Sequence, residues 1–532
     1  MTRTSFRPVA AVGLVAVVLI YVGCSKPREA AIPAPVDRVD SSSPSASTSN
    51  IEVSATEKIP KVIAEWSTTP PTGILLVSGE QNGYLQPCGC TDGQLGGLGR
   101  RFDLIDKLRS RGWPVVPIDL GNLIANPAGS RGGFEQEKIK FDTAIKALSV
   151  MKYEAVALGA EDLKLGVFQT LGVLFNVKEP KFLAANLTPG DGFEETIHAS
   201  LITKAGPISV GVTAVIAPES FEALSDPDKA ALLTVKPPEE VIPGVLENLK
   251  AKSQVCVLLV QGSIEEARRL GEKFPGFDLI VSKSIYSEGE SQPEMLNDGK
   301  TILINVGQKG KFVGVVGIFP GKDPMLRYVL QPLDQNGLRE AESMRALIDE
   351  EMQAVLKSVG VVENFPRRAN NAGSPGATYV GAETCKSCHP KTFDKWASTK
   401  HARAFEALLT PKRNREYDAE CISCHTTGFK YESGWISAEQ TPYLKGNQCE
   451  NCHGPASLHI AEPDNLVYRK PMAMSAELAD SNGFCINCHD EDNDHNFTFP
   501  ARYAQIYHKG LDSYEDPKVH QPQALKGAAE GR

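Results

Sequence analysis

One short pattern, Cys-x-x-Cys-His, occurs four times in the C-terminal third of this 532-residue chain and constrains it more than any other feature. The copies are Cys385-Lys-Ser-Cys388-His389, Cys421-Ile-Ser-Cys424-His425, Cys449-Glu-Asn-Cys452-His453 and Cys485-Ile-Asn-Cys488-His489. One turn of chain places two thiols where the vinyl groups of a porphyrin take them as thioethers, and the adjacent histidine reaches the iron as its proximal ligand. Zinc knuckles share Cys-x-x-Cys but rarely place histidine after it in every copy. The pattern predicts four haems c, attached through eight cysteines and four histidines.

The spacing of the motifs predicts how the haems are packed. The segment from Val380 to Lys509 is about 130 residues long, which is too little protein to bury four porphyrins in an ordinary core. The haems must themselves form the core, near van der Waals contact, with the chain wound around them. Such packing allows fast electron hopping, so we predict a short electron conductor that works with redox protein partners.

Three stretches in this segment carry a resemblance to a known family. They read Tyr-Val-Gly-Ala-Glu-Thr-Cys-Lys-Ser-Cys-His from residue 379, Trp-Ala-Ser-Thr-Lys-His-Ala-Arg-Ala-Phe from residue 396, and Cys-Glu-Asn-Cys-His-Gly-Pro-Ala-Ser-Leu-His from residue 449. Over residues 378–510 the chain resembles the tetrahaem cytochrome c-554 family, whose members receive electrons from hydroxylamine oxidoreductase.

The resemblance implies distal ligands for two of the irons, His401 for the iron of His453 and His459 for the iron of His389. For the iron of His489 the predicted ligand is His508, which follows an aromatic run over residues 497–503. In that family the iron corresponding to that of His425 is five-coordinate. Four residues are unplaced candidates for the sixth ligand of the His425 iron: His495, His520, Met472 and Met474. An open iron would allow chemistry on a small molecule.

The N-terminus has the features of an export signal. Arg3 and Arg7 precede an apolar run over residues 9–22, and Gly23-Cys24 follows. The run is short for a membrane span, and a small residue before cysteine resembles the cleavage box of bacterial lipoproteins. We predict a signal peptide over residues 1–24, lipidation of Cys24 and a membrane tether. An uncleaved anchor or a plain signal peptide are the alternatives, and each places the chain outside the cytoplasm.

Between the export signal and the haem motifs, the chain alternates strand and helix patterns. The expected strands are Ile74–Ser78, Val115–Leu120, Ala155–Leu158, Phe182–Leu187, Ile208–Ile216, Val255–Val260, Leu279–Val281, Ile302–Val306 and Phe312–Phe319; the expected helices include Phe102–Arg111, Lys138–Met151, Ser263–Phe274 and Leu338–Lys357. Apolar strands linked by helices predict sheets covered on both faces. The short loop between the last two strands predicts a mixed sheet.

The same region resembles a second family. The motifs are Gly-Tyr-Leu-Gln-Pro-Cys, Gly-Gly-Leu-Gly-Arg-Arg, Pro-Ile-Asp-Leu-Gly-Asn-Leu, Ala-Val-Ala-Leu-Gly-Ala-Glu-Asp and Gly-Lys-Phe-Val-Gly. Over residues 73–330 they resemble the calcineurin-like metallophosphoesterases, closest to the periplasmic 5′-nucleotidases. The resemblance implies a four-layered α/β sandwich with two metals that clamp a phosphate ester.

The metal ligands of that family are missing from this chain. Its Asp-x-His motif is replaced by Glu80 and Asn82, its bridging aspartate by Asn122, and its Asn-His pair by Ala160 and Glu161. His198 is the only histidine between residues 25 and 388, and one histidine cannot build such a site. We therefore expect a scaffold or docking domain, although carboxylates alone could hold magnesium or calcium weakly.

The predicted domain order follows from these features. It comprises the signal peptide 1–24, a flexible Ser/Pro-rich tether 25–66, a phosphoesterase-like α/β domain 67–360, a linker 361–377, a mostly helical or irregular tetrahaem domain 378–510 and a tail 511–532. Two cysteines stay unassigned, Cys88 and Cys90, whereas Cys256 lies in an apolar run and is expected to be a buried thiol.

Together these features favour an electron-transfer lipoprotein, periplasmic or at the outer surface, with no assigned catalytic residue. The net charge of −9 argues against nucleic acid as a partner. One alternative is an oxidoreductase that acts on a small nitrogen or oxygen species at the iron of His425. The other is a divergent metal-dependent phosphoesterase or nucleotidase; its candidate residues are Glu80, Asp119, Glu161 and Asp162.

Overall fold

The computed structural model describes residues 58–87, 93–370, 375–410, 413–481 and 483–512. The predicted signal peptide, Cys24, most of the tether, Cys88, Cys90 and His520 lie outside these residues. Residues 61–66, which we placed in the flexible tether, form helix α1 (Lys61–Trp66), which buries Val62, Ile63 and Trp66. Over the described residues, no helix has the length and apolar character of a membrane span.

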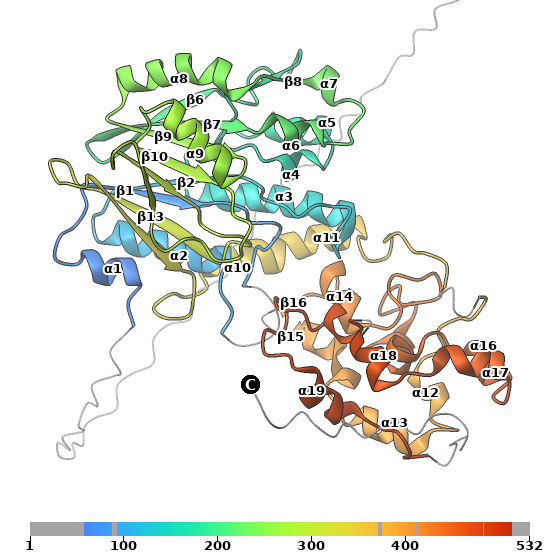
Figure 1. Cartoon of the computed structure of the whole chain (residues 1–532). Helices are drawn as coiled ribbons and strands as arrows, with labels where there is room; N and C mark the ends of the chain where they lie inside the picture. The colour runs from blue at the N-terminus through green and yellow to red at the C-terminus, as the bar shows by residue number, and fades with distance from the viewer. Residues whose placement is uncertain (1–57, 88–92, 371–374, 411–412, 482, 513–532) are drawn as a thin grey trace, which may run out of the picture. The chain divides into compact units, whose positions relative to one another are not determined.

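Two six-stranded mixed sheets form the N-terminal part of the fold (Figure 1). The first has the order β14-β13-β1-β2-β3-β4, with β1 (Gly73–Ser78), β2 (Val115–Asp119), β3 (Ala155–Ala157), β4 (Lys181–Leu183), β13 (Phe312–Ile318) and β14 (Leu326–Pro332). The second has the order β11-β12-β10-β9-β7-β6, with β6 (Ser200–Ala205), β7 (Ile208–Ile216), β9 (Val255–Gln261), β10 (Leu279–Ser282), β11 (Glu294–Leu296) and β12 (Thr301–Ile304).

The sheets are mixed, as predicted, but not for the predicted reason. The last two expected strands follow one another along the chain, yet β12 pairs with β10 and β11 whereas β13 pairs with β1 and β14. The loop between β12 and β13 therefore crosses from one sheet to the other. The antiparallel contacts come from β13 against β1 and β14, from β6 against β7 and from β11 against β12.

Three apolar cores define four layers in this part of the fold, residues 61–359, which we call the sandwich. Inward-facing residues of both sheets, such as Val77 and Val257, share one core. The outer face of the first sheet packs on α2 (Leu98–Ser110) and α3 (Gly133–Val150), and that of the second on α8 (Pro238–Lys252) and α9 (Ile264–Lys273). Strands such as β1 and β9 are buried at every position because helices and a second sheet cover both faces.

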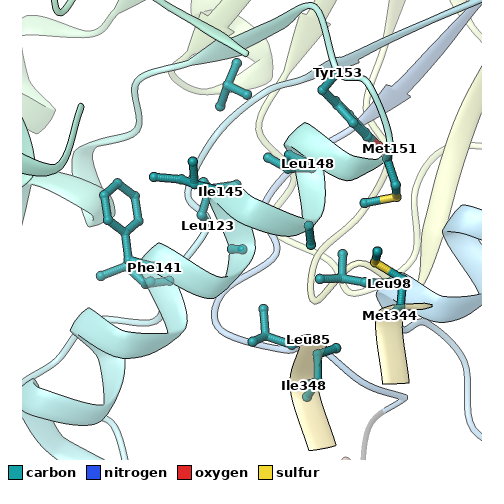
Figure 2. Packing of buried hydrophobic residues seen from close by; sticks show 14 of the residues in the cluster. Leu85, Leu98, Leu123, Phe141, Ile145, Leu148, Met151, Tyr153, Met344 and Ile348 are labelled. Carbon is teal, nitrogen blue, oxygen red and sulfur yellow. The ribbon is translucent and has the colours of Figure 1, made fainter. Parts of the chain in front are cut away.

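Apolar side chains from distant parts of the chain meet under α3 (Figure 2). Phe141, Ile145 and Leu148 repeat at helical spacing on α3 and are all buried. Met344 and Ile348 join the same core from the segment after the last strand. That segment, predicted as one helix, comprises α10 (Glu342–Arg345), the π-helix η1 (Ala346–Met352) and α11 (Gln353–Val359).

The C-terminal segment, residues 375–512, consists of short helices and turns. They are α12 (Ala382–Cys385), α13 (Pro390–Ala397), η2 (His401–Arg403), η3 (Phe405–Leu408), β15 (Leu409–Thr410), β16 (Arg413–Asn414), α14 (Ala419–His425), η4 (Pro442–Leu444), α15 (Cys449–His453), α16 (Ser457–Ala461), α17 (Leu466–Arg469), η5 (Lys470–Met472), α18 (Ala476–Ser481), η6 (Cys485–Asn487) and α19 (Phe499–Ile506). Few of its apolar side chains are fully buried, among them Trp435 and Ile422. This agrees with a segment whose own apolar residues make only a small core.

Candidate functional site

Each Cys-x-x-Cys-His motif folds as a single turn. In motifs 1 and 4 the backbone N–H of the histidine donates to the carbonyl of the first cysteine, His389 to Cys385 and His489 to Cys485, each at 2.9 Å. Motifs 2 and 3 are the helices α14 and α15 themselves. A turn brings both thiols and the histidine to one side of the backbone, as thioether attachment requires. The cysteines of the four motifs form no disulfide.

The thiols of different motifs lie next to one another. The thiols of Cys385 in motif 1 and Cys449 in motif 3 interact with each other, as do those of Cys424 in motif 2 and Cys488 in motif 4. Cys452 of motif 3 lies within electrostatic range of Cys485 of motif 4. The attachment points therefore form a continuous row in the order motif 1, motif 3, motif 4, motif 2.

Hydrogen bonds orient three of the proximal histidines. The Nδ1 atom of His425 contacts the carbonyl oxygen of Ala404 at 2.5 Å, and that of His453 contacts the carbonyl oxygen of Met472 at 2.7 Å. His489 instead directs Nδ1 at the carboxylate of Asp494, 2.9 Å away. A histidine that donates from Nδ1 keeps its Nε2 lone pair for a metal. The three rings are therefore oriented for iron on the other nitrogen.

Burial favours the neutral, iron-binding form of several of these histidines. Burial is the largest cause of the lowered pKa of four histidines: His401, His425, His453 and His459. Neutral imidazole is the form that binds a metal.

Two of the histidines outside the motifs lie beside other proximal histidines than the sequence analysis assigned to them. The ring of His401 lies against His489, with centroids 6.0 Å apart, and the ring of His508 lies against His453 at 5.8 Å. Metal–imidazole bonds are about 2.0–2.1 Å for zinc, so two imidazoles across one metal have ring centres roughly 6 Å apart. The spacing fits one iron between each pair. The sequence analysis had paired His401 with His453, from the resemblance, and His508 with His489, from its place in the chain.

The remaining histidines fall into two groups. His459 lies within electrostatic range of His389, in agreement with the implied pair for the first iron. His425 has no imidazole ring near it among the ring contacts of the described residues. His495 is exposed and contacts Asn496. Among the described residues, a second histidine thus lies near each of His389, His453 and His489, whereas no ring contact joins another histidine to His425.

The sandwich contacts the residues that directly precede motif 2. Gln136 on α3 uses both ends of its amide: Nε2 donates to Asp418 at 2.8 Å, and Oε1 accepts from the backbone N–H of Ala419 at 2.8 Å. Lys140, one turn further on, places Nζ 2.6 Å from Glu420. Three consecutive residues before Cys421 are therefore held by a single helix of the sandwich.

The sandwich also contacts the acidic loop that follows motif 4. The carboxylate of Asp492 accepts from Tyr84 Oη at 2.8 Å and from Lys311 Nζ at 3.3 Å, and it also pairs with Lys309. Arg131 pairs with Asp490 at 2.5 Å. Positive side chains of the sandwich thus meet carboxylates that flank the haem motifs.

Acidic residues flanking motifs 2 and 4 are visible in the sequence, as Asp-Ala-Glu before Cys421 and as Asp-Glu-Asp after His489. That signal could have identified both contact regions. Arg131 carries no comparable signal, because it is an ordinary loop arginine until the fold is known.

Protein donors occupy the carboxylates at the strand ends of the sandwich. Asp162 accepts from the backbone N–H groups of Asn122, Leu123, Ile124 and Gly159 at 2.7–3.4 Å. Asp119 accepts from Ser78 Oγ at 2.5 Å and Gly121 N at 2.7 Å, and the guanidinium of Arg101 lies 3.7 Å away. Backbone and side-chain donors of the protein thus surround both carboxylates.

Burial also changes the charge state of two carboxylates at these strand ends. Burial raises the pKa of Glu80 from 4.5 to about 7 and that of Asp162 from 3.8 to about 7. Glu80 accepts one hydrogen bond, from the backbone N–H of Ser284 at 2.6 Å. Among the described residues, no group of three or more histidine, cysteine, aspartate or glutamate side chains is arranged to hold a metal ion.

Comparison with known proteins agrees with the geometry of the C-terminal segment. Residues 384–454 match the family described as cytochrome c554 and c-prime. A stretch of 92 residues is 34% identical to cytochrome c-554 of Nitrosomonas europaea and covers 15% of this chain and 39% of that protein. A stretch of 111 residues is 30% identical to the multihaem cytochrome MtrA of Shewanella baltica and covers 18% of this chain and 32% of that protein. The chain therefore spans 39% of the first relative and 32% of the second, and the resemblance predicted for this segment is confirmed.

Solved structures similar to this chain include a 5′-nucleotidase precursor from Thermus thermophilus, at 17% identity and a TM-score of 0.46. The match covers 56% of this chain and 60% of that one. The calcineurin-like phosphoesterase YfkN of Bacillus subtilis matches at 19% identity and a TM-score of 0.43, over 54% of this chain and 98% of that one.

Proposed function

We propose that this protein is a multihaem electron carrier with four covalently bound haems c. The observation that carries the proposal is the row of neighbouring thiols from motif 1 through motifs 3 and 4 to motif 2. Haems attached along such a row lie in succession, so an electron that enters at one end can pass between neighbouring irons. Its donor and acceptor are redox proteins.

The distal ligands follow from the ring pairs. We assign His401 to the iron of His489, His508 to the iron of His453, and His459 to the iron of His389. Two histidine ligands leave no coordination position for a substrate, so these three irons serve electron transfer.

The iron of His425 supports a second candidate function. Its proximal ring is held by Ala404, and the described residues bring it no second histidine. An iron with a free position binds small molecules, so an oxidoreductase that acts on a small nitrogen or oxygen species is the alternative.

We propose a non-catalytic role for the sandwich, which holds the second and fourth haem motifs through Gln136, Lys140, Arg131 and Lys309. Its carboxylates are filled by protein donors. The predicted domain boundaries are consistent with this role and stay predictions. We further propose that the protein is exported and tethered by lipid at Cys24, because haem attachment belongs to the same compartment as the predicted signal.

The test begins with purified, haem-matured protein. Intact mass and a pyridine haemochrome assay should give four haems per chain, and substitution of both cysteines of one motif should remove one. Reduced protein is then exposed to carbon monoxide. Binding by about one haem in four supports an open iron at His425, whereas no binding supports the pure relay. A chain that holds fewer than four haems contradicts the proposal.

A further inference from the structure

Arg131 brings a positive charge from the sandwich to the place where motifs 2 and 4 meet. Its Nη2 atom donates to Oδ2 of Asp490 at 2.5 Å, and Asp490 directly follows His489. The guanidinium also lies within electrostatic range of Cys424 and Cys488, the neighbouring thiols of these two motifs. No other charged side chain of the sandwich has a described interaction with thiols of two different motifs.

The loop that carries Arg131 is held by its own hydrogen bonds. The hydroxyl of Ser130 donates to Glu137 at 2.6 Å, and the backbone N–H of Gly132 donates to the same hydroxyl at 3.1 Å. Gly129 and Ser130 both donate their N–H groups to the carbonyl of Asn126 at 3.0 Å. The guanidinium is thus attached to an anchored stretch of backbone, and its charge has a defined position.

Two further charges lie near the place where motifs 2 and 4 meet, and they add to the electrostatic potential that Arg131 produces there. Asp490 contributes a negative charge through its ion pair with Arg131. Lys430 contributes a second positive charge, within electrostatic range of Cys424 and Cys488. Since Arg131 and Asp490 are both about one third exposed, solvent weakens their fields without removing them.

We propose that Arg131 sets the reduction potential of the haems attached at motifs 2 and 4. This inference rests on the proposed function. A ferric haem carries one more positive charge than a ferrous haem, so a fixed guanidinium nearby disfavours the ferric form and raises the potential. Each transfer moves one electron from a reductant, such as a neighbouring ferrous centre, to a ferric iron, and it forms or breaks no bond. The sandwich therefore tunes the relay as well as holding it.

The experiment is a mediated potentiometric titration of the full-length, haem-loaded protein, followed in the Soret and α bands. Arg131→Gln should lower the reduction potential of one or two of the four haems. The expected decrease is about 59 mV, which corresponds to about a tenfold smaller equilibrium constant for a one-electron reduction. Arg131→Lys, which keeps the charge, should stay near the wild type. Asp490→Asn should shift a potential upwards, and the double variant R131Q/D490N should return towards the wild type.

The matched control is Lys146→Gln. Lys146 lies on α3 in the same domain and pairs only with Asp142, and both side chains are half-exposed. Loss of its charge should move no potential, because exposed charges beyond about 8 Å are screened at physiological salt.

The outcomes separate this inference from the proposed function. A wild-type chain without haem overturns both. Four haems with unshifted potentials in Arg131→Gln overturn the assignment of Arg131 alone. Equal changes of the haem potentials in Arg131→Gln and Arg131→Lys show that Arg131 has a purely structural role. That outcome also overturns the assignment of Arg131. If Arg131→Gln does not bind its haems, the inference is tested on Asp490→Asn. That variant should raise a haem reduction potential, and a lowered potential refutes the inference.

Discussion

The imidazole rings of His401 and His489 face each other with their centroids 6.0 Å apart and their planes at 47°. His489 belongs to the last haem motif, whereas His401 follows the first. An iron between them would join the beginning and the end of the C-terminal segment through one coordination bond on each side. On this assignment, the fourth iron would take its sixth ligand from a residue that follows the first motif.

The first prediction concerns this pair. His401→Ala should leave the fourth iron without its sixth ligand, turn it high-spin and add one carbon monoxide-binding haem to the reduced protein. When haem attachment at motif 4 is also removed by C485A/C488A, the His401 substitution should add no further binding. When attachment at motif 3 is removed by C449A/C452A, it should still add one. The measurement is carbon monoxide titration followed in the Soret band.

His495→Ala is the control for that experiment, because it removes an exposed histidine from the same segment and should leave carbon monoxide binding unchanged. If instead the effect of His401→Ala disappears in the motif 3 background and persists in the motif 4 background, His401 ligates the third iron.

The second prediction concerns the carboxylate behind the fourth proximal histidine. Asp494 accepts from Nδ1 of His489 at 2.9 Å and is 8% exposed. A buried carboxylate makes the imidazole a stronger electron donor and stabilises ferric iron. Asp494→Asn should therefore raise the potential of one haem in a potentiometric titration. Asp464→Asn, an exposed acid in the same segment, should have no effect, and an equal shift in both variants would contradict the role given to Asp494.

Local features of this fold could be predicted from the sequence, and long-range ones could not. The motif turns depend on five adjacent residues, and strands such as β9 follow from apolar runs such as residues 255–260. The partner of His401 depends on how segments far apart in the chain pack, which no local pattern records. The same reason explains β12 and β13, which are adjacent in sequence but belong to different sheets.

In the sandwich, residue identities alone predict which metal ligands are replaced but not how the replacing side chains are bonded. The sequence showed that Glu80 and Asn122 replace metal ligands, but not what fills the space. The structure shows backbone N–H groups directed at Asp162 and Glu80. Their geometry depends on strand ends brought together by the sheets, including left-handed backbone at Glu80 and Asn122, where φ is 46° and 56°.

The third prediction concerns the ion pairs between the sandwich and motif 2. Lys140 is 6% exposed and contacts Glu420 at 2.6 Å and the fully buried Glu137 at 3.5 Å. Lys140→Met should lower the free energy of unfolding by about 3 kcal/mol, because it leaves a buried carboxylate without a counter-charge. Guanidinium unfolding followed by far-ultraviolet circular dichroism measures the change.

Two variants check the origin of that loss. Lys146→Met breaks the exposed pair with Asp142 on the same helix and should cost at most about 0.5 kcal/mol. K140M/E137Q removes the stranded charge as well and should recover part of the stability. A cost as large for Lys146 as for Lys140 would show that the helix, and not the buried charge, is responsible.

The fourth prediction concerns pH. Burial raises the pKa of Glu80 from 4.5 to about 7, so between these values the folded chain holds a proton that the unfolded chain has lost. The folded state then binds more protons, and its stability falls as the pH rises from about 4.5 to about 7. Glu80→Gln removes this loss. The free energy of unfolding of Glu80→Gln, relative to wild type, should increase by about 3 kcal/mol across that window. Denaturant unfolding at pH 4.5, 6 and 8 measures it. Glu65→Gln, at an exposed position of α1, should follow the wild-type pH profile. If Glu80→Gln follows it too, the Glu80 carboxyl ionises in the folded protein at its ordinary pKa, and burial does not control its charge.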